Sequence, residues 1–101
     1  MRDRNFILNS IKMDLHRVVT AVGKIDHEIP KQSVIEFLNH ATKDLNGLQL
    51  TPNEQLLKSQ LQTLINKIPE THDLYSRLRW AEDVMTIRCR LIVPVGPTEQ
   101  D

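Results

Sequence analysis

Apolar residues recur at spacings of three and four along most of this chain, which is the periodicity of amphipathic α-helices. The last long segment, residues 71–92, carries two such rows. The first row is Leu74, Leu78, Ala81, Met85 and Ile92, and the second row is Trp80, Val84, Ile87 and Leu91. Together the rows cover about half of the helix circumference, whereas a surface helix needs an apolar stripe of only about 100°. A helix with two apolar rows is expected to contact two sets of neighbours.

Two helices are predicted in the first half of the chain. The first begins near Asp3 or Arg4 and ends around Gly23, and the second runs from residue 30 or 31 to Asn46, before Gly47. The apolar seam of the first is Leu8, Ile11, Leu15, Val18, Val22 and Ile25, and the inward face of the second is Val34, Leu38, Ala41 and Leu45. Phe6 and Met13 fall on the far side of the first seam, where they could widen a partner surface.

The clearest local signal lies at residues 51–54, which read Thr-Pro-Asn-Glu. The Thr51 hydroxyl can cap the Glu54 amide while the glutamate reaches back to Thr51, and proline suits the first helical position. A third helix therefore starts at Pro52, and we expect Pro69 to end it. Its narrow apolar stripe is Leu57, Leu61, Leu64, Ile65 and Ile68.

The fourth helix is predicted to be capped by Thr71, with Asp73 near the positive end of its dipole. Residues 87–91 also alternate as a strand would, but the only other strand-like segment, residues 48–50, is very short. A lone strand leaves its backbone groups unpaired, so we extend the helix to about Ile92. Residues 93–101 are expected to be a flexible tail after a single helical-bundle domain over residues 1–92.

The predicted fold is all-α: a small antiparallel four-helix bundle of two helical hairpins, turning at Ile29-Pro30 and Ile68-Pro69. The fourth helix would pack on its own bundle through one row and on a second chain through the other, and a two-fold dimer is the commonest solution. Aromatic residues and arginine are enriched at interface centres. The predicted partner interface is Arg77, Trp80, Val84, Ile87, Arg88 and Leu91, with the two arginines fixing the register.

Composition bounds the class of protein without identifying it. Thirteen basic residues balance thirteen acidic residues, so no overall field attracts nucleic acid or anionic lipid. Hydrophobic residues make up 40% of the chain, which is an ordinary globular value. A single cysteine, Cys89, excludes an intrachain disulfide and suits a reducing compartment. Since no signal-peptide or membrane-length apolar run is present, we expect a cytoplasmic protein that does not contact the membrane.

Motifs for catalysis are missing. None of the four histidines stands in metal-ligand spacing with another, and the Glu-x-x-His motif of di-iron bundles is absent. No Gly-x-Ser-x-Gly surrounds a serine, and the glycines are too scattered for a phosphate loop. Cys89 lies between two arginines without an obvious base, so we expect an inert thiol. The sequence therefore predicts no enzyme, cofactor, metal or small-molecule substrate.

His40 is predicted to face solvent on the second helix, paired with Glu36 one turn earlier. The segment from His40 to Asp44, His-Ala-Thr-Lys-Asp, is similar to the His-x-hydrophobic-Lys-Gly core of histidine phosphotransfer domains at the histidine and lysine. It departs at the hydrophobic position and at the glycine, and Asp44 adds a negative charge. A phosphotransfer-like module using His40 is an alternative reading.

A second alternative is a helical protein that associates with nucleic acid through the arginines of the fourth helix, Arg77, Arg79, Arg88 and Arg90. Glu82 and Asp83 interrupt this basic set, and aromatic residues are scarce, and both features weigh against the nucleic-acid interpretation. The sequence as a whole favours a non-catalytic helical interaction or regulatory module, a dimer or a partner of another protein. Its specific role is not encoded in any motif.

Overall fold

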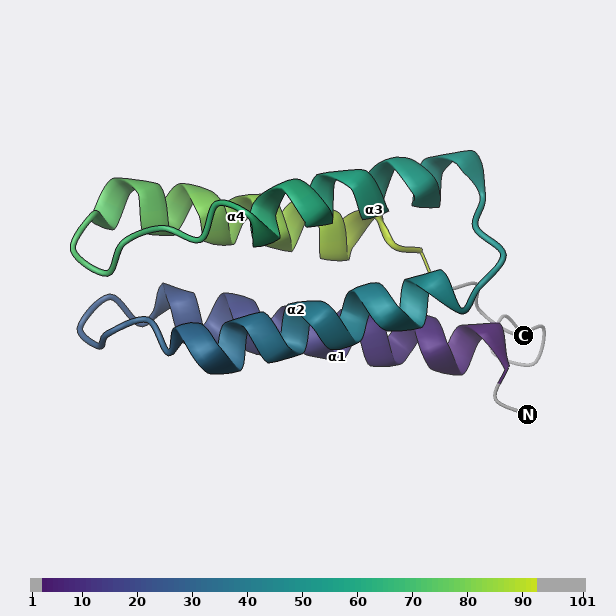
Figure 1. Ribbon diagram of the computed structural model, residues 1–101, viewed down its shortest axis with the longest axis horizontal. Helices are drawn as coiled ribbons and strands as arrows, with labels where there is room; N and C mark the ends of the chain where they lie inside the picture. Colours follow the sequence, from purple (N-terminus) through teal and green to yellow (C-terminus); the bar gives the residue numbers. More distant parts are fainter. Residues whose placement is uncertain (1–2, 93–101) are drawn as a thin grey trace, which may run out of the picture.

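The computed structural model describes residues 3–92, and its four helices confirm the all-α bundle (Figure 1). The helices are α1 (Arg4–Gly23), α2 (Lys31–Asn46), α3 (Pro52–Ile65) and α4 (Leu74–Arg90). Within the described residues there is no strand, so the segment around Ile87 is helical, as the sequence analysis preferred. The predicted tail, residues 93–101, lies outside the described residues.

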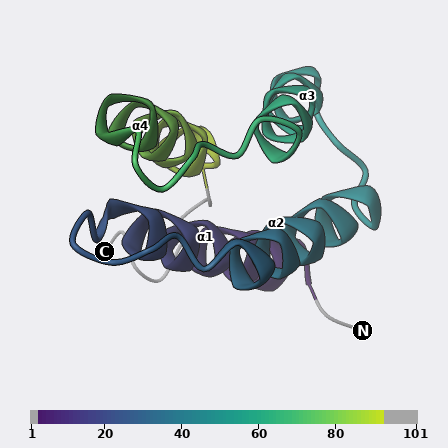
Figure 2. The ribbon, with the colours of Figure 1, turned by 60° about the vertical axis from the view of Figure 1, so that its left-hand side comes forward.

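The four helices form two antiparallel hairpins, with α4 lying over α1 and α3 lying over α2 (Figure 2). Each helix packs against the helices before and after it in the chain, and α1 and α4 close the ring. All four contribute to one core. Its buried apolar side chains are Leu8, Ile11, Leu15, Val18, Val22, Ile29, Val34, Leu38, Ala41, Leu45, Leu57, Leu61, Trp80, Ala81, Val84, Ile87 and Leu91.

The predicted helix starts are confirmed for α3 and corrected for α4. Thr51 accepts from the Glu54 amide at 3.2 Å while the Glu54 carboxylate accepts from the Thr51 amide at 3.0 Å, which completes the capping box. For α4 the cap is Asp73, whose carboxylate accepts from the Ser76 amide at 3.1 Å. Thr71 instead accepts a hydrogen bond from the Ile29 amide at 3.1 Å, because its hydroxyl faces the other hairpin loop.

Two helices end earlier than predicted. α3 stops at Ile65, four residues before Pro69, because Asn66 takes the C-cap position and the chain turns there. α4 stops at Arg90, where Leu91 is the C-cap with an extended backbone. Both hairpin loops lie at the same end of the bundle (Figure 1), so the Thr71 hydrogen bond to Ile29 joins one loop to the other.

Candidate functional site

The sequence pattern predicts a partner contact at the second row of α4, and the structure corrects this assignment. The side chains of Trp80, Val84, Ile87 and Leu91 are at most 5% exposed. The Trp80 indole donates to the Leu64 carbonyl of α3 at 3.0 Å. The second row therefore serves the chain's own core and is not available to a partner while the bundle is closed.

Arg77 is fully buried, which also conflicts with a place in a partner interface. Its guanidinium donates to the carbonyls of Val22 at 3.0 and 3.3 Å, Lys24 at 2.9 Å and Thr71 at 3.1 Å. The first two carbonyls lie at the C-terminal end of α1, where the helix dipole favours a positive charge. The sequence pattern predicts that Arg77 fixes the register of a partner interface, whereas in the structure Arg77 is a clasp that joins α1 to the α3–α4 loop.

The remaining arginines of α4 do not form a basic patch. Arg88 is half-buried and donates to the Lys12 carbonyl of α1 at 3.1 Å. Arg79 is exposed and lies 3.8 Å from the Asp83 carboxylate on its own helix. Because Arg77 and Arg88 point into the bundle, the geometry gives no support to the nucleic-acid alternative.

The first row of α4 is the one that faces outward. On α4 itself, Leu74 and Leu78 are 47% and 50% exposed, Met85 is partly buried and Ala81 is buried; Ile92, which is 72% exposed, follows the end of the helix. Single exposed apolar residues are ordinary, but several on one helix face are the sign of a contact surface. In the structure the second row of α4 therefore faces the chain's own core, and the first row is the more exposed of the two.

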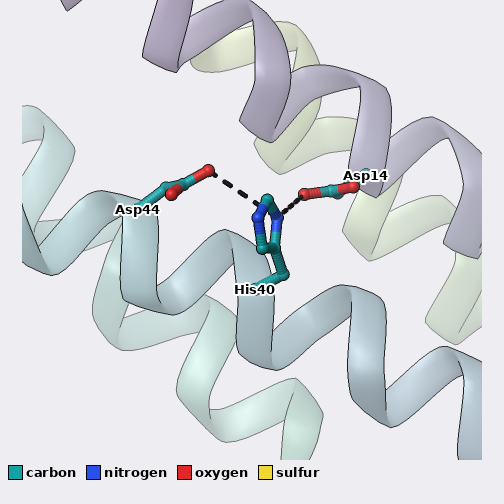
Figure 3. Close-up of side chains that lie close together, drawn as sticks. All are labelled: Asp14, His40 and Asp44. Atoms are coloured by element: carbon teal, nitrogen blue, oxygen red, sulfur yellow. Dashed lines mark hydrogen bonds and ion pairs between the residues drawn. The ribbon is translucent and has the colours of Figure 1, made fainter. Parts of the chain in front are cut away.

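The second candidate site is a cluster of His40, Asp14 and Asp44 between α1 and α2 (Figure 3). Nδ1 of His40 lies 2.5 Å from Oδ2 of Asp14 and 3.7 Å from Oδ2 of Asp44. The Asp14 side chain is 6% exposed and the Asp44 side chain 12%, whereas that of His40 is 53% exposed. The site therefore consists of two mostly buried carboxylates and a half-exposed imidazole ring.

The cluster raises the pKa of the His40 ring above its ordinary value. The hydrogen bond to Asp14 and the negative charge of Asp14 are the main causes, and the charge of Asp44 adds to them, while burial and Lys43 act in the opposite direction without cancelling the rise in pKa. Nε2 of His40 makes no hydrogen bond with any described residue. The predicted Glu36 partner is absent from this arrangement, because Glu36 accepts instead from Gln32 at 3.5 Å.

Asp14 is held from its other side by Arg17, whose Nη1 lies 3.2 Å from Oδ1. The Arg17 guanidinium also lies over the Phe37 ring, 5.7 Å from its centroid. Asp44 differs from Asp14, because its Oδ2 atom is buried without a hydrogen bond to any residue of the described chain. Among residues 3–92, the cluster therefore contains a buried carboxylate oxygen whose only ion-pair neighbour is Nδ1 of His40, at 3.7 Å.

Sequence reasoning missed this cluster because its members come from two helices. His40 and Asp44 are four residues apart and share a helix face, which a search for acidic neighbours could have found. Asp14 precedes the seam residue Leu15 and so lies at the edge of the apolar face of α1. A carboxylate at such an edge, facing the next helix, was the available signal.

Comparison with known proteins adds no identity to this fold. No protein-family model matches the chain, and neither a curated protein nor a solved structure shows significant similarity to it. A membrane-crossing helix needs a longer apolar stretch than any helix of residues 3–92 offers. The class that the coordinates define is a small antiparallel four-helix bundle, and its function has to be argued from its own surfaces.

Proposed function

We propose that this chain is a non-catalytic helical interaction module that self-associates through the exposed part of the first row on α4. The observation that carries this proposal is the outward position of Leu74 and Leu78, with the partly exposed Met85 further along the same face of α4. These residues are separated by four and seven positions. That spacing is typical of the seam through which one helix packs on another.

The occupant that we propose for this seam is the α4 helix of a second copy. About a two-fold axis each copy offers the same residues, so one self-complementary surface satisfies both chains. Tyr75, which is 75% exposed beside Leu74, adds the residue type that is enriched at interface centres. Leu74, Leu78 and Met85 are not part of the bundle core, so association through them requires no opening of the fold.

A matched pair of substitutions tests the dimer. Leu78 on α4 and Leu56 on α3 are the same residue type and are 50% and 55% exposed. Leu78→Lys is expected to abolish dimerisation because it places a charge in the seam, whereas Leu56→Lys is expected to leave it unchanged. Sedimentation velocity over a range of protein concentrations measures the mass of each variant, and circular dichroism checks that both stay folded.

Two intrinsic probes separate the exposed row from the buried row. Cys89 is an exposed thiol on α4 near this surface, so its alkylation should slow as the dimer forms. Trp80 is 5% exposed within its own chain, so its emission should not change when the dimer is diluted to monomer. A wild-type chain that stays monomeric at high micromolar concentration refutes the proposal, as does equal loss of dimer in both lysine variants.

We also propose a cytoplasmic location, because a lone free cysteine is the usage expected in a reducing compartment. This part of the proposal rests on composition only. Cell fractionation of the tagged chain in its native host checks it, with recovery among secreted proteins as the contradicting result.

Phosphotransfer through His40 is a second candidate. It is favoured by the contact of Nδ1 with Asp14, which leaves the other ring nitrogen, Nε2, as the exposed nucleophile. Incubation with a small phosphodonor should then yield an acid-labile phosphate that is absent from His40→Gln and retained in His16→Gln. An unlabelled wild-type chain, or equal labelling of both variants, rejects this candidate.

A further inference from the structure

We propose that Asp14, His40 and Asp44 bind a divalent first-row transition ion of the zinc type. The three side chains offer two carboxylate oxygens and one imidazole nitrogen within 4.8 Å of one another. This inference is independent of the α4 contact surface, because the cluster lies between α1 and α2. It depends on the mutual geometry of the donors and on the unsatisfied oxygen of Asp44.

The donor spacing fits a small tetrahedral ion. Zinc bonds of about 2.0–2.2 Å to nitrogen and oxygen place neighbouring donors roughly 3.3–3.5 Å apart. Nδ1 of His40 is already 3.7 Å from Oδ2 of Asp44. Its 2.5 Å separation from Oδ2 of Asp14 is that of two atoms sharing a proton, and it would widen by under about 1 Å when an ion replaces the proton.

The unsatisfied oxygen of Asp44 is the independent sign of a ligand. Oδ2 of Asp44 is buried and makes no hydrogen bond within the part of the chain that the structure describes. Burying an acceptor without a hydrogen bond destabilises a fold, and more so when the acceptor is charged. A cation between Asp44, Asp14 and the ring would satisfy this oxygen and separate the two carboxylates, which the proton between His40 and Asp14 does not achieve.

The surroundings supply the rest of a binding site. His40 and Asp44 stand one turn apart on α2, so helix geometry positions two ligands. Arg17 holds the other oxygen of Asp14, Oδ1, at 3.2 Å and so orients the carboxylate as an outer partner. Because the His40 side chain is 53% exposed, solvent can reach the cluster, and a water molecule or another fourth ligand could bind the ion from that side.

The same contacts select among ions. Two aspartates and one arginine leave a net charge of −1 around a neutral imidazole, which favours a cation over an anion. Magnesium and calcium take six or more oxygen ligands, so a site with one nitrogen and two carboxylates does not suit them. The mixed nitrogen and oxygen set suits zinc or cobalt, and the reactivity of the ion is not part of the proposal.

Titration of the chelator-treated, desalted chain with Co²⁺ and with Zn²⁺ tests the site. We expect one ion per chain, a Co²⁺ visible spectrum of a low-coordinate nitrogen–oxygen site, and a higher melting temperature with Zn²⁺. Asp44→Asn should weaken binding by about tenfold or more. This variant keeps the shape of Asp44 and removes no hydrogen bond of Oδ2, so it is expected to fold.

Two controls make the result specific. His27 and Asp26 form another His–Asp pair, 3.8 Å apart, but both are exposed in a loop, and no third ligand lies with them among the described residues. His27→Gln should therefore bind the ion as wild type does. Each titration is repeated in Cys89→Ser, because an exposed thiolate also binds zinc. Absence of saturable binding, equal binding by wild type and Asp44→Asn, or loss of binding only with Cys89→Ser would overturn the proposal.

Discussion

Replacing Arg77 with methionine is the most informative test of how this bundle is held together. The guanidinium is fully buried and donates to three carbonyls, of Val22, Lys24 and Thr71. Among the residues that the structure describes, no carboxylate lies within ion-pair distance of it. Methionine preserves much of the apolar stem and removes every one of these hydrogen bonds. The substitution therefore isolates the polar contribution of the clasp.

The expected loss in the free energy of unfolding follows from the hydrogen-bond partners of Arg77. Hydrogen bonds from a charged donor contribute about 1.5–3 kcal/mol each, so three acceptors give a gross loss of roughly 5–9 kcal/mol. Water can reach the carbonyls of Lys24 and Thr71, whose bonds are only partly buried, and removal of a buried charge recovers its desolvation cost. We expect a net loss of about 3–5 kcal/mol, close to the whole stability of a marginal domain of this size.

Urea unfolding followed by circular dichroism measures this loss, with Trp80 emission as a second probe of the core. Arg79→Met is the control on the same helix, since Arg79 is 63% exposed in its side chain and should change stability by less than about 0.5 kcal/mol. The stability of Arg77→Lys should fall between that of wild type and that of Arg77→Met, because one ammonium group cannot satisfy three carbonyls. If Arg77→Met and Arg79→Met unfold at the same urea concentration, the clasp does not stabilise the fold.

Three further predictions concern single contacts. Thr51→Ala breaks the capping box and should cost about 1 kcal/mol in thermal unfolding, with Thr51→Ser restoring most of it. Burial alone would raise the pKa of Glu54, but hydrogen bonds from Arg4 and Thr51 outweigh it and hold the pKa below its ordinary value. This stabilisation is present above the ordinary pKa of 4.5 and is lost as pH falls through the lower pKa of the folded state. The free energy of unfolding of wild type should therefore exceed that of Glu54→Gln most near neutral pH. A difference in stability that grows on acidification contradicts the ion pair. Trp80→Phe leaves the Leu64 carbonyl without its donor and should cost about 1–3 kcal/mol by chemical unfolding, and an unchanged midpoint would show that this bond is dispensable.

The helices and their order could be predicted because each carries an apolar stripe and ends at a proline, a glycine or a cap. The Thr51 capping box fixes the start of α3 to the residue, since both of its partners lie within four positions. By contrast, the predicted cap of α4 was wrong, because Thr71 and Asp73 are both residue types that favour the N-cap position. Thr71 is used by Ile29, a residue of the other hairpin loop, and such a contact leaves no trace in local sequence.

The candidate sites were less predictable for the same reason. Both rows of α4 are apolar, and a helical projection gives no preference for which row faces the core. The His40 cluster depends on Asp14, which lies 26 positions away on α1, and helix packing alone decides that these two side chains meet. Sequence spacing could bring His40 and Asp44 together but could not supply Asp14, the third member of the cluster.

Polar contacts fix the rotation of α4, and they explain why its first row faces outward. Arg88 reaches the Lys12 carbonyl on α1, and Trp80 reaches the Leu64 carbonyl on α3. A turn of α4 that buried Leu78 would move both donors away from these acceptors and would also withdraw Arg77 from the end of α1. Because burying an unpaired guanidinium costs more than exposing a few leucine side chains, the helix keeps its first row in solvent. A partner that covers the exposed part of this row would gain apolar contact without disturbing any of these bonds, so the dimer that we propose requires no opening of the bundle.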